Sequence, residues 1–254
     1  MIGISLALGC DPQDTPVDRR SVSQQTLMEM FLEGIENKER ICAKGDETED
    51  LSEWKGVLLN EEQEVVEIDW EYFGLEARKL TKKFPTGRNH FTKKPSSRKT
   101  HKEIPFFSFS PFFLKDGSEK SFDLQWLPDT LRQLLISNNE IKATLDLKKL
   151  PTDLIYIDVR RNKFSGEVCL SILPRNLEIM SLSYNRLNGT IDLTSLPSRI
   201  RQLFLESNDF IGNIDFSHLP KSLNFLDISN TRLSGKLTTR IRCFRAEKTR
   251  VQIV

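Results

Sequence analysis

The dipeptide Leu-Pro recurs five times in the second half of the chain, and each copy follows the previous one by 23 residues. When the five copies are superposed, seven columns of apolar residues align, and only Thr239 breaks them. A period of this length is typical of a solenoid, in which each repeat forms one coil and buries its apolar side against the next. The leucines of the dipeptide are Leu127, Leu150, Leu173, Leu196 and Leu219.

Two further columns of the repeat are not apolar. An asparagine column holds Asn139, Asn162, Asn185 and Asn208. A carboxamide both donates and accepts hydrogen bonds, so this column predicts a ladder that bonds backbone groups of its own coil and of the neighbouring coil. A glycine column holds Gly166, Gly189, Gly212 and Gly235, which predicts a tight turn with positive φ.

The combined pattern, L-P-x-x-L-x-x-L-x-L-x-x-N-x-L-x-G-x-I-D-L, resembles the leucine-rich repeat of the plant-receptor-like subclass. The resemblance implies an α/β solenoid with a parallel concave β-sheet, a helical N-terminal cap and an irregular convex side. It covers roughly residues 50–75 and 121–238.

The segment around Trp54, Gly56 and Val57 resembles the N-terminal cap of such arrays. Apolar residues at helical spacing upstream of it predict a helix that contains Leu27, Met30, Phe31 and Ile35. The plant-type cap usually has two half-cystines, but the matching positions hold Ser52 and Leu59. Their absence favours an intracellular location, because proteins there do not rely on disulfides. The alternative is a secreted protein whose cap has lost the two cysteines by sequence drift.

We therefore expect five segments. They are a flexible N-terminus (1–22), the cap helix with the first repeat strand (23–76), a disordered basic and Phe-rich insert (77–121), the repeats (122–238) and a basic tail (239–254). The insert is inferred from the spacing of the columns. Val66 and Ile68 match the first two strand columns, which places the later column that contains Leu145 at position 77, whereas its first member appears at Phe122. The insert is interpreted as a functional basic arm, a neutral insertion, or translated non-coding sequence in an imperfect gene model.

The net charge of +1 hides a strong separation of charge along the chain. Residues 29–71 carry 15 acidic and four basic residues, and residues 77–102 carry ten basic and no acidic ones. The simplest account is that the two segments compensate each other in cis. Binding of the basic segment to nucleic-acid phosphates is the alternative.

No sequence motif points to catalysis. The phosphate-binding and dinucleotide-binding glycine motifs and the G-x-S-x-G nucleophile motif do not occur. The four cysteines lack metal-ligand spacing, and no stretch is apolar enough for a transmembrane helix. We therefore expect a protein that is not an enzyme and has no cofactor and no bound metal.

Function is expected on the concave sheet, where alternate strand residues point away from the core. Aromatic residues and arginine commonly anchor interfaces, which predicts a monomeric module that binds a protein or peptide. The alternatives are a nucleic-acid or ribonucleoprotein component acting through the insert and tail, and the sensor ectodomain of a receptor. The predicted ligand-binding residues are Tyr156, Asp158, Arg160, Arg161, Tyr184, Phe204, Glu206, Phe225 and Asp227.

Overall fold

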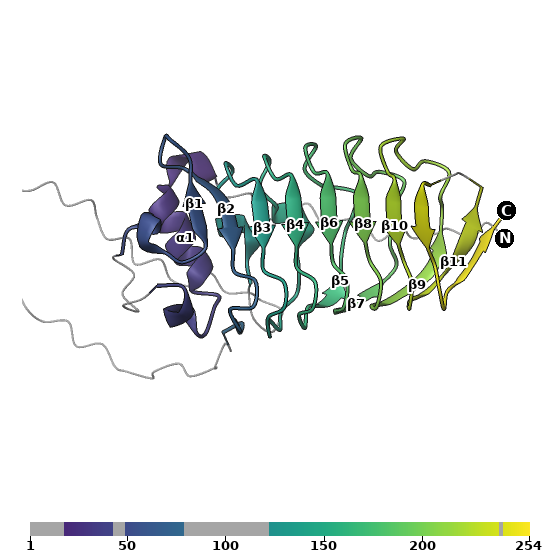
Figure 1. The fold of residues 1–254 in the computed structure, drawn as a ribbon, viewed down its shortest axis with the longest axis horizontal. Helices are drawn as coiled ribbons and strands as arrows, with labels where there is room; N and C mark the ends of the chain where they lie inside the picture. The colour runs from purple at the N-terminus through teal and green to yellow at the C-terminus, as the bar shows by residue number, and fades with distance from the viewer. Residues whose placement is uncertain (1–17, 43–48, 79–121, 239–240) are drawn as a thin grey trace, which may run out of the picture.

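The computed structural model describes residues 18–42, 49–78, 122–238 and 241–254. It is a solenoid whose coils stack along one axis (Figure 1). The flexible N-terminus and the insert that were expected from the sequence lie largely outside the described residues, at 1–17 and 79–121.

Each coil contributes one short strand to an eight-stranded sheet of order β1-β2-β3-β4-β6-β8-β10-β12. Only β1 and β2 pair antiparallel, and all other neighbours are parallel and in register. The strands are β1 (Val57–Leu59), β2 (Val65–Asp69), β3 (Gln133–Leu135), β4 (Tyr156–Asp158), β6 (Ile179–Ser181), β8 (Gln202–Phe204), β10 (Phe225–Asp227) and β12 (Cys243–Arg245).

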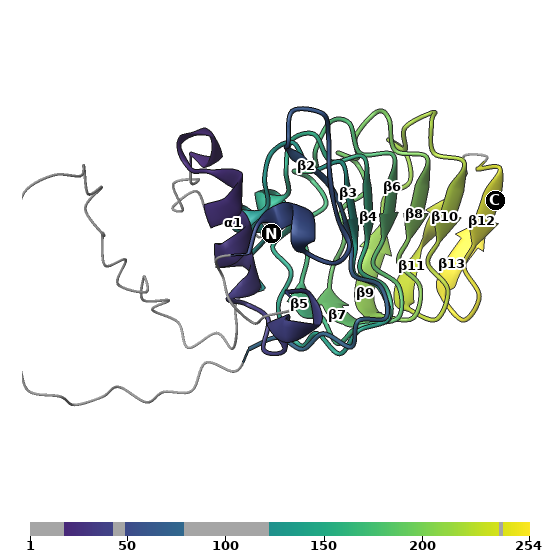
Figure 2. The same cartoon turned by 60° about the vertical axis from the view of Figure 1, so that its left-hand side comes forward.

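A second parallel sheet lies on another side of the solenoid (Figure 2), with the order β13-β11-β9-β7-β5. This part is more regular than the irregular convex side that was expected. The glycine column is the reason, because its positive φ and missing side chain let neighbouring coils approach closely. The strands are β5 (Ser165–Glu167), β7 (Arg186–Gly189), β9 (Asp209–Ile214), β11 (Arg232–Leu237) and β13 (Arg250–Ile253).

The apolar columns of the repeat form one continuous core. The first three strand-side columns, which begin at Leu131, Leu134 and Ile136, are buried in all five repeats. Short 3-10 helices close the first coils, at η4 (Leu124–Trp126) and η5 (Leu147–Lys149). Stacking therefore buries apolar side chains that no single coil could shield, as expected for a solenoid.

The first coil has a different register from the one expected. Ile68 pairs with Leu134, so the matching columns hold Ile68 and Trp70 instead of Val66 and Ile68. Ala77 forms a bridge with Ile35, and the Arg78 backbone N–H donates to the Gly34 carbonyl oxygen at 2.9 Å. Residues 77 and 78 thus belong to the first coil.

A helix, α1 (Gln24–Leu32), lies at the N-terminal end of the stack (Figure 2). The Ser23 side chain caps it by accepting from the Thr26 N–H. Its buried residues are Leu27, Met28, Phe31 and Leu32. Phe31 stacks on Trp70 with ring centroids 5.9 Å apart. Three 3-10 helices flank it in sequence, η1 (Arg19–Ser21), η2 (Lys38–Arg40) and η3 (Leu51–Glu53).

The C-terminal segment forms a last coil rather than only a basic tail. Phe244 of β12 pairs with Leu226, and Val251 of β13 pairs with Gly235. Both side chains pack against the core and cover its end. Within the part of the chain that the structure describes, no helix is long and apolar enough to cross a membrane.

Candidate functional site: the concave sheet

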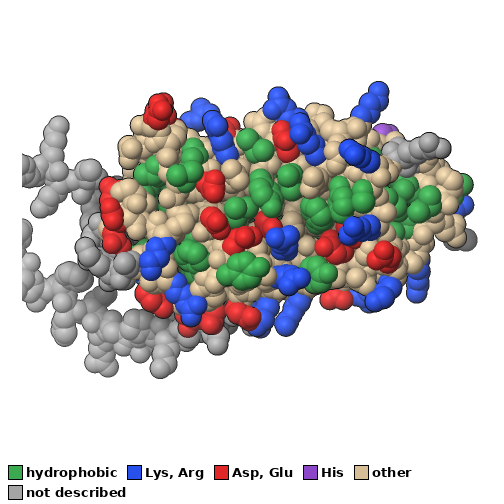
Figure 3. All heavy atoms as spheres, in the orientation of Figure 1, with side chains coloured by type: hydrophobic (Ala, Val, Ile, Leu, Met, Phe, Trp, Pro, Cys, Tyr) green, Lys and Arg blue, Asp and Glu red, His purple; other side chains and the backbone are tan. Residues whose placement is uncertain are grey.

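Five consecutive strands, β3, β4, β6, β8 and β10, each direct one apolar or aromatic side chain to the concave face. They come from two adjacent rows of the sheet, with Tyr156, Ile179 and Phe225 in one row and Leu135 and Phe204 in the other. We call this set the apolar lane, and each of its side chains is half-buried. Figure 3 shows the corresponding band of apolar side chains across the sheet, with charged side chains beside it. The lane consists of Leu135, Tyr156, Ile179, Phe204 and Phe225.

Aromatic rings and arginines contact each other at two places on this face. The rings of Phe204 and Phe225 lie 4.7 Å apart, and the Arg245 guanidinium lies 5.4 Å from the Phe225 ring centroid. The Arg161 guanidinium lies 5.1 Å from the ring of Tyr184, which is 48% exposed. Such cation–π contacts hold the side chains in place while leaving area open to a partner.

Two of the predicted ligand residues, Asp158 and Asp227, are buried and serve the fold. Oδ1 of Asp158 accepts from the Arg160 N–H at 3.0 Å, and Oδ1 of Asp227 accepts from the Ser229 N–H at 2.9 Å. Each carboxylate thus bonds the backbone two residues further on, where its strand ends. Only 1% of Asp158 and 6% of Asp227 is exposed, so neither side chain is free to meet a ligand directly.

Both aspartates also form ion pairs on the concave face. Nε of Arg160 lies 3.2 Å from Oδ2 of Asp158. Nη1 of Arg245 lies 3.8 Å from Oδ2 of Asp227. The arginines are about half-exposed, so they form the outer part of each pair.

Burial raises the pKa of three groups in the centre of the face. It raises the pKa of Asp158, which the backbone N–H and the charge of Arg160 partly offset. Burial also raises the pKa of Tyr156, and the neighbouring Asp158 charge adds to this. Burial likewise raises the pKa of Glu206, with a further contribution from the Asp227 charge. Among the described residues, Oε2 of Glu206 has no hydrogen-bond partner.

The concave face extends beyond the nine predicted residues at both ends. The register of β2 adds Glu67 and Asp69, and that of β12 adds Arg245. Sequence reasoning missed them because it drew its candidates only from the five regular repeats and did not recognise the last coil. The seven predicted residues other than Asp158 and Asp227 are exposed or half-buried on this face: Tyr156, Arg160, Arg161, Tyr184, Phe204, Glu206 and Phe225.

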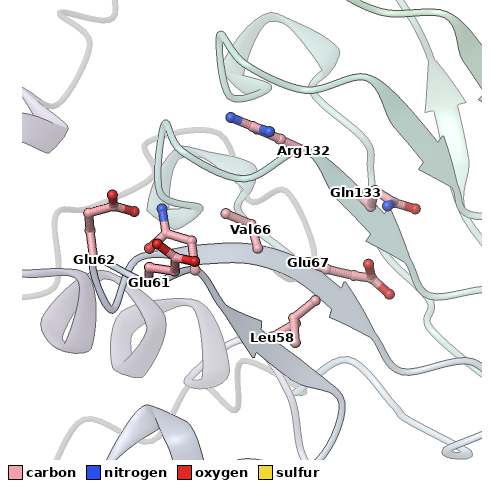
Figure 4. A pocket seen from close by; sticks show the side chains of 8 residues that line it. Leu58, Glu61, Glu62, Val66, Glu67, Arg132 and Gln133 are labelled. Carbon is pink, nitrogen blue, oxygen red and sulfur yellow. The ribbon is translucent and has the colours of Figure 1, made fainter.

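A hollow of about 380 Å³ lies where β1 ends and β2 and β3 begin (Figure 4). Its apolar lining comes from Leu58 and Val66. Three carboxylates border it, those of Glu61, Glu62 and Glu67. The remaining lining residues are Asn60, Arg132 and Gln133.

A column of residues with positive φ follows the strands of the concave sheet. Each of them lies one residue before the asparagine column or its equivalent, with φ between 53° and 58°. Sequence reasoning assigned positive φ to the glycines only. The signal was the asparagine at two of these positions, since Asn tolerates this conformation better than most residues. The column consists of Tyr72, Asn138, Arg161, Tyr184, Ser207, Asn230 and Lys248.

The asparagine column binds successive coils together. In Asn208, Nδ2 donates to the Leu182 carbonyl oxygen one coil back at 3.0 Å, and Oδ1 accepts from the Leu187 N–H at 3.1 Å. Asn139, Asn162 and Asn185 make the equivalent bonds. The chain is a leucine-rich repeat solenoid. Its ladder ends at Thr231, whose hydroxyl donates to the Ile228 carbonyl oxygen within the same coil.

Comparison with known proteins finds solved structures that resemble this solenoid. The BIR2 ectodomain from Arabidopsis thaliana is 14% identical, with 91% of this chain and 94% of that chain covered and a TM-score of 0.48. A structure of the BIR3–SERK2 complex from the same plant is 14% identical, with 88% of this chain and 95% of that chain covered and a TM-score of 0.42. The plant peptide hormone receptor RGFR1 in complex with RGF2 is 21% identical, with 52% of this chain and 27% of that chain covered and a TM-score of 0.34. No family model and no curated protein matches the chain.

The intracellular location expected for this solenoid is contradicted by these comparisons, since one of the similar structures is an ectodomain and another is a plant peptide hormone receptor. The expectation rested on two missing half-cystines in the cap. The structure shows why they say little about the compartment. The cap is closed by packing of Phe31 on Trp70 and by the bond from Trp70 Nε1 to the Lys55 carbonyl oxygen at 2.8 Å.

Proposed function

We propose that this chain is a non-enzymatic interaction module that binds a protein or peptide partner on its concave sheet. The observation that carries the proposal is the cluster of half-buried aromatic rings and arginines on that face, at Phe204, Phe225 and Arg245 and at Arg161 and Tyr184. Aromatic and arginine side chains supply most of the binding energy in many interfaces. Rings held by neighbouring contacts lose little conformational freedom on binding, which favours affinity.

The nucleic-acid alternative has less support than the sequence suggested. The C-terminal basic residues do not form a separate arm, because β12 and β13 complete the last coil. Arg245 is also already in contact with Phe225 and Asp227. A nuclease treatment in the crosslinking experiment would reveal binding that depends on nucleic acid.

Site-specific photo-crosslinking tests the proposal. The photo-reactive residue p-benzoylphenylalanine replaces Tyr184 on the concave side or, as a matched control, Ile211 of β9, which is 42% exposed. Both proteins are irradiated in native extract with and without nuclease. We expect nuclease-resistant protein adducts at position 184 that are absent at position 211. Equal adducts at both positions, or adducts that need intact nucleic acid, would contradict the proposal.

Once the crosslinked partner is identified, its affinity for the purified protein gives a quantitative test. Arg161→Ala and Tyr184→Ala remove one contact pair from the face. Removal of an interface anchor typically weakens binding about tenfold or more. Lys236→Ala is the control, because Lys236 is exposed on β11 of the second sheet. Unchanged affinity in the two face variants would place the binding surface elsewhere.

A further inference from the structure

The N-terminal end of the apolar lane is acidic. Glu67 and Asp69 of β2, and Glu71 two residues after the strand, direct their side chains to the concave face. Glu61 and Glu62 border the adjoining hollow (Figure 4). Within the described parts of the chain, no ion pair neutralises any of these five carboxylates, so their charge is available to a partner.

The C-terminal end of the lane is basic. Arg245 lies beside Phe225, the last residue of the lane, and 56% of its side chain is exposed. Arg242 and Lys248 precede and follow it in the same coil, and both are exposed. Glu247 is the one exposed acidic residue of residues 241–250, so this coil keeps a net positive charge. The lane therefore runs between two ends of opposite charge.

We propose, building on the proposed function, that the lane binds an extended segment of a partner protein with an apolar centre, a basic residue over β2 and an acidic residue over β12. β2 and β12 are six strand spacings apart, which is about 29 Å at ~4.8 Å per strand. An extended chain of about nine residues spans this length at ~3.3 Å per residue. A segment with two ends of the same charge would meet a like charge at one end.

The hollow fits the basic end of such a segment. Leu58 and Val66 offer apolar surface to the methylene groups of a lysine or arginine side chain, and three glutamates border the hollow against one arginine, Arg132 (Figure 4). At the other end, the Arg245 guanidinium uses one nitrogen for the 3.8 Å pair with Asp227. Its planar group carries five N–H donors, so it can bind a second carboxylate from the open side.

Competition among three pools of nine-residue peptides tests this inference. All pools share a central mixture of Leu, Phe, Val, Ser and Gly, and they differ in their end residues. One pool carries Arg and Asp at opposite ends in both orders, one carries Arg at both ends, and one carries Asp at both ends. The immobilised full chain is incubated with all three pools, and retained peptides are quantified by mass spectrometry. We expect the oppositely charged pool to be enriched about three- to tenfold, as two partly exposed ion pairs allow.

Charge reversal at either end then shifts the preference in a defined direction. Glu67→Lys favours the pool with Asp at both ends, and Arg245→Glu favours the pool with Arg at both ends. The matched controls are Glu33→Lys at the end of α1 and Lys236→Glu on β11, both exposed and outside the lane. The controls should leave the order of the pools unchanged.

The outcomes separate this inference from the proposed function. Peptide retention that is lost in Phe204→Ala/Phe225→Ala but is indifferent to the end charges overturns the charge inference and leaves concave-face binding intact. Retention that survives this double variant contradicts binding on the lane itself. Failure to retain any pool overturns the extended-segment inference, while photo-crosslinking at position 184 still decides the proposed function.

Discussion

Asn162 joins two coils of the solenoid through a bond to Ile136. Its Nδ2 donates to the Ile136 carbonyl oxygen, one coil back, at 2.8 Å, while its Oδ1 accepts from the Ile141 N–H at 3.1 Å. The side chain is buried. A single carboxamide thus satisfies a buried donor and a buried acceptor that water cannot reach.

Asn162→Ala should therefore destabilise the protein strongly. It leaves the buried Ile141 N–H without a partner, at about 1–3 kcal/mol, and removes one of the two amide bonds to the Ile136 carbonyl oxygen, which Asn139 Nδ2 also donates to at 2.9 Å, so we expect a loss of roughly 3 kcal/mol. For a chain of this size that corresponds to a fall in Tm of about 6–12 °C. Urea unfolding and calorimetry measure both values. Asn224→Ala is the control, because Asn224 is exposed, and a comparable loss there would refute the ladder's role.

Gly56→Ala should be far more damaging than alanine at a repeat glycine. A Cβ at Gly56 would lie 2.0 Å from the Asp69 carbonyl oxygen, and the residue has φ +74°. At Gly166, with φ +87°, the nearest atom to an added Cβ is a methyl carbon of Thr144 at 3.4 Å. We expect Gly166→Ala to lose about 1–2 kcal/mol from backbone strain alone, and Gly56→Ala to lose about 3 kcal/mol or more because overlap is added. Equal losses in urea unfolding would contradict this reading of the cap.

The sequence was sufficient to define the core because its apolar columns repeat strictly every 23 residues. It was insufficient at both ends, where the repeat changes. Trp70 fills a column that aliphatic residues fill in the five repeats, so the pattern favoured a register two residues too early. Cys243 follows its strand partner Phe225 by 18 residues, and this shorter coil did not match the period.

The concave site was predictable in position but not in the state of its residues. Alternation along a strand shows which side chains point away from the core, and all nine predicted residues lie in the strands or in the turns that follow them. It does not show which neighbours cover them. Asp158 is buried because Tyr156 and Arg160 lie against it. This burial depends on rotamers and cross-strand contacts that no residue spacing encodes.

Ser207→Asn should stabilise the chain. Ser207 has φ +56°, and asparagine adopts this conformation at lower cost than serine. The chain itself carries asparagine at the same register in two other coils, at Asn138 and Asn230. We expect a gain of about 0.5–1 kcal/mol in urea unfolding, by analogy with other relieved backbone strain. Ser195→Asn is exposed and outside this column, so a similar gain there would show that the effect is unrelated to φ.

Arg19→Ala should loosen the N-terminal segment from the first coils. The Arg19 guanidinium donates to the Gln125 carbonyl oxygen at 2.9 Å and to the Lys149 carbonyl oxygen, and it pairs with Asp129 at 2.7 Å. It thereby binds the ends of η4 and η5, and only 11% of its side chain is exposed. We expect a loss of roughly 2–3 kcal/mol from these charge-assisted bonds. Arg20→Ala, at the exposed neighbouring position, should change stability by less than about 0.5 kcal/mol. Equal effects of the two variants in thermal unfolding would exclude a specific contact.

Glu206 should make the solenoid less stable as the pH rises. Burial and the Asp227 charge raise its pKa in the folded protein above the ordinary value of 4.5, so the folded chain holds the proton more tightly than the unfolded chain. The resulting stabilisation is complete below the ordinary pKa and is lost as the pH rises through the raised one. Glu206→Gln removes this loss, so its unfolding free energy relative to wild type should grow as the pH rises from the ordinary pKa of 4.5 through the raised one. The Ser183 hydroxyl lowers the pKa of Glu206, so Ser183→Ala should move the transition to higher pH. A difference between Glu206→Gln and wild type that stays constant in urea unfolding across this range would show that Glu206 titrates alike in both states.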